Sequence, residues 1–268
     1  MAIERIHLGC PVWGRKDWVG ELFRAGTPQA RYLEEYGKVF NAVEGNTTFY
    51  ATPSPEIVAR WGDQTPPSFR FCFKLPKTVT HDRQLVNARR EAEGFIARMA
   101  PLGSRLGPFM IQLPPHFGPS QLPTLEDFLV GLPRDFRYAV EVRHPALFGG
   151  AACEELDAVL REQGVDRVVL DTRGLHGRGP IDPHHAASQA KKPKLPLHVA
   201  VTGTQPLVRF IGDPEEGANE GLLWGWAKRV AQWIDDGLRP YVFMHCPNDF
   251  FAPRLARHFV SMVGQRTA

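Results

Sequence analysis

The stretch FNAVEGNTTFY, residues 40–50, begins as a buried strand and ends in polar and aromatic side chains. Alternate side chains of a strand share a face, so we expect Glu44, Asn46 and Thr48 to point one way and Val43 the other. A polar row at the end of a strand is typical of a functional site or of a buried hydrogen-bond network. The row by itself is compatible with either.

Seven further segments have the apolar character of short strands, and helical patterns separate most of them. They are residues 5–11, 69–76, 109–115, 138–144, 167–172, 207–212 and 240–247. Strands that alternate with helices favour a parallel sheet with crossover helices, and eight such units favour closure into a barrel. The sequence therefore predicts one α/β domain over residues 1–268, a TIM-barrel-like (β/α)8 fold.

The expected helices lie between these strands. They cover about residues 28–37, 53–62, 85–102, 124–129, 154–162, 221–234 and 253–263. Thr27 is the expected N-cap of the first helix, with Pro28 at its first position. The helix over 221–234 has a stripe at helical spacing that predicts a core-facing side, formed by Leu223, Trp226, Val230 and Trp233.

Residues 173–206 are the exception, because they are rich in Gly, Pro, His and Lys and have no clear periodicity over 173–196. They predict a long loop that serves as a lid or a partner surface. Within it, residues 197–201 are expected as an extra strand or an extended approach to the next one. The run KKPK at 191–194 favours a solvated loop over a patch that follows phosphates.

The composition is that of an ordinary globular protein, with 43% hydrophobic and 23% charged residues. A net charge of +3 is weaker than the excess typical of dedicated nucleic-acid binders. Cys10, Cys72, Cys153 and Cys246 include no CxxC pair, so neither a zinc knuckle nor a disulfide framework is expected. Reduced, buried thiols, the lack of a signal-peptide pattern and the lack of a ~20-residue apolar run predict a cytoplasmic protein that does not enter the membrane.

The polar side chains of this chain gather at the ends of the expected strands, where TIM barrels have their active sites. The candidate catalytic residues are Glu44, Glu141 and Lys74. The candidate substrate-binding residues are Asn46, Gln112, Arg143, Asp171, Arg209, His245, Asn248, Trp13 and Tyr50.

Each candidate has an alternative role. Glu44 and Glu141 are either a general acid and a general base, or structural carboxylates paired with Arg143 or Arg209 across the barrel mouth. Lys74 either binds an anion or forms a Schiff base, and anion binding is favoured because a nucleophilic lysine needs a strongly lowered pKa. The two arginines are suited to bidentate capture of phosphate or carboxylate.

A divalent metal would have Glu44, Glu141, Asp171 and His245 as ligands. No tight ligand spacing occurs, and a mouth that contains Arg and Lys neutralises carboxylates without an ion, so no cofactor is predicted. Aromatic residues lie beyond the strand ends, among them Trp13 and Tyr50. We expect them either to stack on a sugar or a base or to plug the mouth of the barrel.

Several runs together resemble the DUF72 (YecE-like) family. Besides residues 40–50 they are FCFK at 71–74 with Thr80-His81, the segment from Gly107-Pro108 to QLPPHF at 112–117, and AVEVRH at 139–144. They stretch over most of the chain in family order. The resemblance implies a TIM-barrel-like fold but no particular reaction, since a distant likeness to endonuclease IV and xylose isomerase barrels is a fold-level analogy.

The chain departs from the family pattern at three strand ends. RFIGD at 209–213 stands where many members have Arg-x-His-Gly-Arg, CPVW at 10–13 replaces a Ser-Gly-aromatic sequence, and HCPN at 245–248 replaces an asparagine pair. We therefore expect a divergent member in which the side formed by Glu44, Lys74, Gln112 and Glu141 is intact. A ligand shared with the family at the seventh and eighth strands is in doubt.

Three functions remain open at this point. The leading one is an enzyme, a hydrolase or an isomerase/lyase, that acts on a polar or anionic small molecule such as a sugar or sugar phosphate by carboxylate acid/base chemistry. The alternatives are a nucleic-acid-processing hydrolase resembling endonuclease IV, which needs a basic groove, and a non-catalytic binding protein. The oligomeric state is not predicted.

Overall fold

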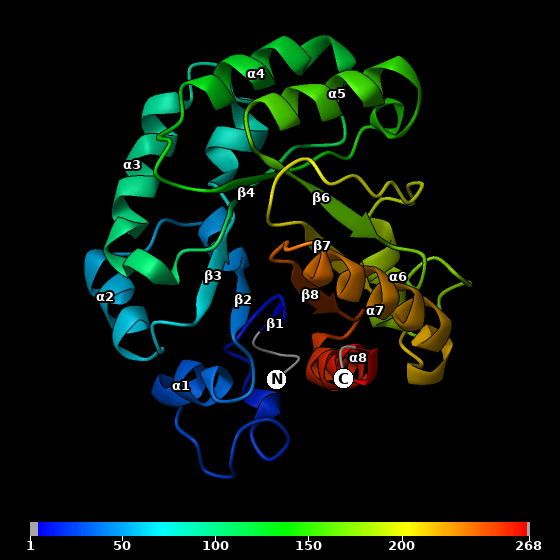
Figure 1. The fold of residues 1–268 in the computed structure, drawn as a ribbon. Coiled ribbons are helices and arrows are strands. Elements are labelled where there is room, and N and C mark those ends of the chain that lie inside the picture. Colours follow the sequence, from blue (N-terminus) through cyan, green and yellow to red (C-terminus); the bar gives the residue numbers. More distant parts are fainter. Residues whose placement is uncertain (1–4, 267–268) are drawn as a thin grey trace.

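The computed structural model describes residues 5–266 and has a parallel strand at each of the eight expected places (Figure 1). The strands are β1 His7–Gly9, β2 Ala42–Gly45, β3 Arg70–Phe73, β4 Phe109–Gln112, β5 Tyr138–Glu141, β6 Asp166–Asp171, β7 Leu207–Ile211 and β8 Tyr241–His245. Each lies within, or within one residue of, the apolar segment that predicted it. The expected α/β single domain with a parallel sheet is confirmed.

The strands pair in two ladders. Six follow the order β1-β8-β7-β6-β5-β4 as one curled sheet, and β2 pairs with β3. Isolated contacts connect the two ladders: Glu44 N donates to Cys10 O at 3.1 Å between β2 and the end of β1, and Leu75 N donates to Met110 O at 3.0 Å between the end of β3 and β4. The strands thus follow the course of a TIM barrel, but residues 5–266 do not form a complete hydrogen-bonded (β/α)8 ring.

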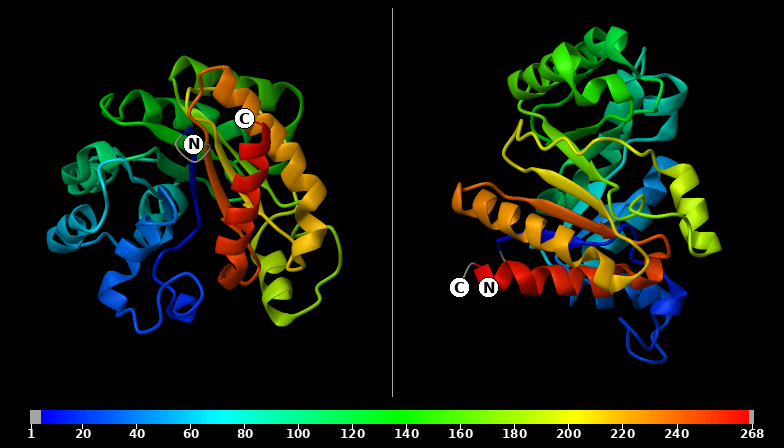
Figure 2. Two further views of the ribbon diagram at one scale, coloured as in Figure 1. Left: turned by 60° about the horizontal axis from the view of Figure 1, so that its bottom comes forward. Right: turned by 90° about the vertical axis from the view of Figure 1, so that its right-hand side faces the viewer.

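The helices surround the strands on the outside (Figure 1). They are α1 Tyr32–Gly37, α2 Pro55–Asp63, α3 Arg89–Met99, α4 Leu122–Val130, α5 Gly150–Glu162, α6 Pro183–Lys191, α7 Glu220–Asp235 and α8 Ala252–Arg266. Figure 2 shows the last helix packed beside α7. Within residues 5–266, no helix combines the length and apolarity needed to cross a bilayer.

Two expectations about helix boundaries are wrong. Thr27 does not cap a helix: its hydroxyl donates to Arg24 O at 2.8 Å, and the 3-10 turn Gln29–Arg31 precedes α1. The pattern over 85–102 is helical only as α3, because Leu85 has a φ of 70° and Asn87 a φ of 52°, which no α-helix accommodates. A 3-10 segment, Ala100–Arg105, follows α3.

Residues 173–206 are not a single long loop, since they contain α6. Asp182 caps this helix: its Oδ1 accepts a hydrogen bond from His185 N at 2.7 Å, and Pro183 is the first helical residue. Residues 197–201 form no strand, so the expectation of an extra strand is wrong; they belong to an irregular connection from α6 to β7.

The core confirms the predicted packing of the helix over 221–234 and the burial of the cysteines. Phe69, Phe71 and Phe73 are buried, and Trp61 of α2 stacks on Phe73 with ring centroids 5.4 Å apart. The predicted stripe of α7 is buried as well. All four cysteines are buried and free. The outer faces of the strands therefore pack against the helices, while the inner faces meet one another.

Candidate active site

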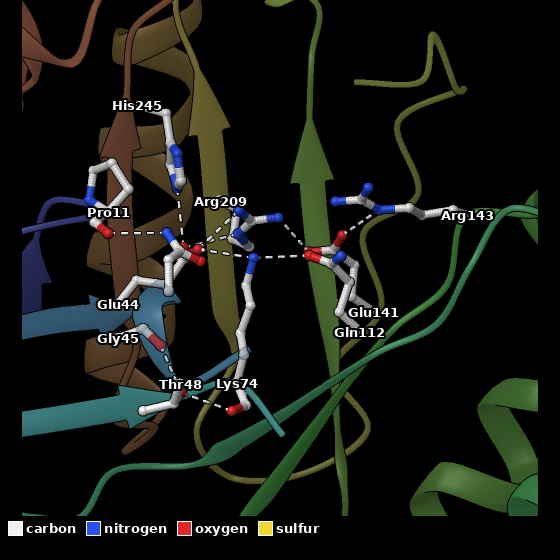
Figure 3. A network of polar contacts seen from close by, with 11 residues as sticks. Pro11, Glu44, Gly45, Thr48, Lys74, Gln112, Glu141, Arg143, Arg209 and His245 are labelled. Carbon is white, nitrogen blue, oxygen red and sulfur yellow. Dashed lines mark hydrogen bonds and ion pairs between the residues drawn. The ribbon is translucent and has the colours of Figure 1, made fainter. Parts of the chain in front are cut away.

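The inward-facing side chains form layers two residues apart. The deeper inward positions are apolar and are Ala42, Cys72, Met110, Ala139, Val168, Leu207, Tyr241 and Phe243, of which the last two are successive inward positions of β8. Because side chains of a strand return to the same face every second residue, the next inward layer lies two positions further on. It contains Glu44, Lys74, Gln112, Glu141, Arg209 and His245 (Figure 3). We call these six residues the polar layer; they come from β2, β3 with the residue after it, β4, β5, β7 and β8.

Arg209 lies at the centre of the polar layer. Its Nε and Nη2 donate to the two oxygens of Glu44, both at 2.8 Å, and its Nη1 donates to Glu141 Oε2 at 2.5 Å (Figure 3). Arg143 Nε donates to the other oxygen of Glu141 at 2.7 Å. Both glutamates are fully buried. The pairing across the mouth that the sequence left as an alternative is therefore present.

These ion pairs keep both carboxylates ionised. Burial alone would raise the pKa of Glu44, but Arg209, Lys74 and His245 more than offset burial and hold its pKa well below the usual range. Burial opposes ionisation of Glu141 in the same way, and its cationic neighbours lower its pKa to about 2. Neither group carries a proton at neutral pH, so neither can act as a general acid there.

Lys74 is the residue of the polar layer whose pKa lies just above neutral pH. Its Nζ donates to Gln112 Oε1 at 2.8 Å and lies 3.3 Å from Glu44 Oε1. Burial and the nearby Arg209 lower its pKa to about 8, although Glu44 and Glu141 act in the opposite direction. A buried lysine with this pKa can exchange a proton near physiological pH.

His245 completes the layer on β8. Its Nε2 lies 3.0 Å from Glu44 Oε2. Burial lowers the pKa of His245 in spite of that carboxylate, so the imidazole is neutral at pH 7. A neutral imidazole whose Nε2 carries the proton donates to Glu44 and holds it in place.

Exposure differs within the cluster. The side chains of Glu44 and Glu141 are 0% exposed, while those of Lys74 and Arg143 are 9% and 14% exposed. The carboxylates thus lie beneath the cations. Three cations, Lys74, Arg143 and Arg209, face only two carboxylates, Glu44 and Glu141, within the cluster.

The polar row on residues 40–50 differs from the expected strand pattern. Strand β2 ends at Gly45, and Asn46–Phe49 form a 3-10 turn, so Asn46 and Thr48 do not continue the face of Glu44. Asn46 Nδ2 donates to Pro11 O at 2.9 Å. The Thr48 hydroxyl lies 2.9 Å from Gly45 O and 2.8 Å from Lys74 O. Both side chains brace the backbone around the polar layer.

The remaining candidates lie away from the polar layer. Asp171 faces outward, since the inward positions of β6 are Val168 and Leu170, and it accepts from Trp226 Nε1 of α7 at 2.7 Å. Asn248 Oδ1 accepts from Phe250 N at 3.0 Å. The ring of Trp13 packs against Trp61 and Phe71, and Tyr50 is 81% exposed.

Lys192 lies near the polar layer and was not among the candidates. It follows α6, is partly buried, and its Nζ donates to Ser188 Oγ at 2.8 Å. Burial lowers its pKa, and the charges of Asp249, Arg209, Glu44 and Arg143 also act on it, which places it beside the mouth. The basic run at 191–194 was the available signal, but it indicated a solvated loop.

The four residues proposed as metal ligands do not form one group. Asp171 pairs with Arg173, at 2.8 Å, on the other side of the sheet from Glu44. Within residues 5–266, the group of ligand-type side chains that comes close enough to share an ion is Cys153, Asp157 and His198, outside the polar layer.

The fold and the polar layer define an α/β protein with a charged cluster at the carboxyl end of a curled parallel sheet. The model of the family "Protein of unknown function DUF72" matches residues 7–268, so the chain belongs to the DUF72 family. It is 44% identical to UPF0759 protein YecE of Escherichia coli K12 over 251 residues, which cover 93% of this chain and 89% of that protein.

Solved structures of two DUF72 family proteins have the same fold. The one from Thermotoga maritima superposes with a TM-score of 0.71 at 23% identity, covering 97% of this chain and 98% of that one. The one from Enterococcus faecalis superposes with a TM-score of 0.68 at 18% identity, covering 98% and 95%. The resemblance that the sequence motifs indicated is confirmed.

Proposed function

We propose that this protein is an enzyme that acts on an anionic small molecule, such as a sugar phosphate, at the polar layer. The observation that carries the proposal is the charge imbalance, in which three cations surround two carboxylates. Lys192 lies nearby, where the charge of Asp249 also acts on it. Buried charges are normally paired, so an anion would complete the cluster.

The proposal treats the eight strands as a TIM barrel whose carboxyl-terminal mouth is the site. Its support is the position of the polar layer, which lies beyond the apolar layer on six strands. The contacts between β1 and β2 and between β3 and β4 are where the ring would close. Active sites of TIM barrels lie at this end.

The roles follow from exposure and protonation. Arg143 and Lys74 would contact the anion, because they are the most exposed members of the cluster. Lys74 would also transfer the proton, since its pKa is about 8. Glu44 and Glu141, both ionised, would serve as hydrogen-bond acceptors for sugar hydroxyls or as bases, and the carboxylate acid/base pair expected from the sequence becomes a lysine–carboxylate pair.

The first experiment measures anion binding. Calorimetric titration with inorganic phosphate and with a panel of sugar phosphates, at constant ionic strength, is done on the wild type, Arg143→Gln and Lys192→Gln. Hydrogen bonds to charged groups contribute about 1.5–3 kcal/mol, so each substitution is expected to weaken binding by roughly tenfold to hundredfold. Lys191→Gln is the matched control, because Lys191 is exposed and adjacent to Lys192.

The second experiment tests catalysis with the phosphates that bind. Lys74→Met is expected to lower kcat by about 10²–10⁴, the usual contribution of acid–base catalysis, whereas Arg143→Gln mainly raises KM. Equal binding by wild type, Arg143→Gln and Lys192→Gln would rule out the anion site. If sugar phosphates bind but none is converted, the protein is a binding protein and not an enzyme for these compounds.

A further inference from the structure

Outside the polar layer, α5 and the connection after α6 bring together a thiol, a carboxylate and an imidazole. Cys153 and Asp157 are four residues apart on α5, so they lie on one face of the helix, one turn apart. His198 comes from the irregular segment between α6 and β7. Cys153 and Asp157 are buried, and the side chain of His198 is 26% exposed.

The three groups are in direct contact. His198 Nε2 lies 2.9 Å from Asp157 Oδ2. Cys153 Sγ lies 3.6 Å from Nε2 and 3.7 Å from Nδ1 of the same ring. One ligand atom from each residue lies within 4.8 Å of the others.

We propose that Cys153, Asp157 and His198 form a site for a divalent transition-metal ion of the zinc type. In tetrahedral zinc sites the bonds to sulfur and nitrogen are about 2.3 Å and 2.0 Å, which places the two ligand atoms about 3.5 Å apart. The observed sulfur–nitrogen separation of 3.6 Å is close to this value. Because Sγ lies almost as near to Nδ1, at 3.7 Å, the imidazole has to turn for Nε2 to face the ion. The carboxylate and imidazole atoms, now hydrogen-bonded, need to separate by only about 0.4 Å to reach the spacing of about 3.3 Å.

Arg167 of β6 occupies the outer shell of this site. Its Nη1 donates to Asp157 Oδ1 at 2.6 Å and lies 3.4 Å from Cys153 Sγ, and its Nη2 donates to Leu147 O. These contacts leave Asp157 Oδ2 facing the imidazole. A guanidinium so placed orients the carboxylate and stabilises the thiolate, as outer-shell partners of metal ligands do.

Binding of the ion, with loss of one proton, adds one positive charge to the site. Without metal, the Asp157 carboxylate is paired with Arg167. Metal binding releases the thiol proton of Cys153 to solvent, so that the thiolate and the carboxylate together offset the divalent ion, and Arg167 keeps its charge. Three protein ligands leave the fourth tetrahedral position to water, and His198 provides the exposed side of the site.

The site would tie the connection after α6 to α5. This connection starts beside Lys192, so an ion would also restrict the segment that carries Lys192 to the mouth. The inference stands without the proposed function, because its ligands contact no residue of the polar layer within the part of the chain described.

The test uses Zn²⁺ and Co²⁺ with the untagged, metal-stripped full chain. We expect one Co²⁺ per chain, a thiolate-to-cobalt charge-transfer band in the near ultraviolet, and its displacement by Zn²⁺. Cys153→Ala is expected to abolish the band, and His198→Ala to weaken Zn²⁺ affinity by more than the roughly 10- to 100-fold seen for loss of outer-shell partners. Cys246→Ala and His184→Ala are the matched controls, and we expect them to keep the charge-transfer band and the Zn²⁺ affinity of the wild type.

The melting temperature of each metal-free variant shows whether it folds. His198 is partly exposed, so His198→Ala keeps the fold and remains informative if Cys153→Ala does not fold. The inference is overturned if the wild type shows no charge-transfer band with Co²⁺. It is equally overturned if His198→Ala binds Zn²⁺ as tightly as the wild type does.

Discussion

Arg209 connects the carboxylates of two strands on opposite sides of its own. It contacts Glu44 of β2 through two nitrogens and Glu141 of β5 through a third, and its side chain is 4% exposed. Replacing a buried ion pair as a unit can be neutral for stability, but removing one partner leaves an uncompensated charge. The removal of Arg209 takes the central partner from two buried carboxylates, although Arg143 stays beside Glu141 and Lys74 beside Glu44.

We therefore expect Arg209→Met to destabilise the fold by about 3–5 kcal/mol or more, the usual cost of breaking a buried pair. Urea unfolding followed by circular dichroism measures the change. The double variant Arg209→Met/Glu141→Gln should recover part of the loss, because one of the two buried carboxylates that lost Arg209 is then neutral. A loss for Arg209→Met no larger than that for the exposed pair variant Arg254→Gln would contradict the central role of Arg209.

At the scale of residues, the sequence predicts which side chains lie at the strand ends but not which of them meet. Glu44, Lys74, Gln112, Glu141, Arg209 and His245 share the inward parity, and all six were candidates. Asp171 was grouped with them although Leu170 has the inward position on β6. A shift of one residue along a strand exchanges the two faces. Asp171 ends a run of three apolar residues, Val168 to Leu170, and such a run does not reveal which of its positions point inward.

At the scale of elements, the contact between β1 and β2 depends on a glycine. A Cβ on Gly9 would lie 1.9 Å from Ala42 O and 2.7 Å from Tyr36 Oη. Tyr36 Oη also donates to Ala42 O and accepts from Cys10 N, so it cannot move without loss of both bonds. The absence of a side chain at residue 9 lets the first two strands approach.

We expect Gly9→Ala to destabilise the fold by about 1–3 kcal/mol, as overpacking of a core does, because the strand backbone must shift. Gly94→Ala is the matched control: residue 94 is exposed within α3 and its Cβ would meet nothing within 4 Å. Alanine at this site should stabilise by about 0.5–1 kcal/mol. The urea midpoints of unfolding of both variants measure these changes. An unchanged midpoint for Gly9→Ala would show that β1 and β2 can move apart without loss of stability.

The element that the sequence analysis missed, α6, carries a recognisable start signal. Asp182-Pro183 is an N-cap followed by proline at the first helical position, the same pattern that predicted a helix start at Thr27 and Pro28. The high Gly, Pro and His content of the surrounding residues led to the prediction of a loop in spite of this start signal. The short helix buries only His185 and Ser188, so the sequence has little hydrophobic periodicity there. The strands were predictable because their inward and outward faces both pack, which gives long apolar runs.

At the scale of the whole molecule, the charged cluster makes folding stability depend on pH at both ends of the range. Glu141 has a pKa of about 2 in the folded chain against 4.5 as its ordinary value. Its stabilisation is therefore complete above pH 4.5 and is lost as the pH falls towards 2. Lys74 has a pKa of about 8 against 10.5, so the folded chain binds its proton less tightly than the unfolded chain does. Its destabilising effect is complete below pH 8 and disappears as the pH rises to 10.5.

We expect these two groups to be separable by comparing the wild type with Glu141→Gln and Lys74→Met over the whole pH range. Each shift of 2.5 pKa units corresponds to at most about 3 kcal/mol. The free energy of unfolding of the wild type, relative to Glu141→Gln, should fall by up to that amount between pH 4.5 and 2. Relative to Lys74→Met it should rise by a similar amount between pH 8 and 10.5. Urea unfolding at each pH gives both differences, and a difference that stays constant across its window would show that the group titrates alike in the folded and unfolded chains.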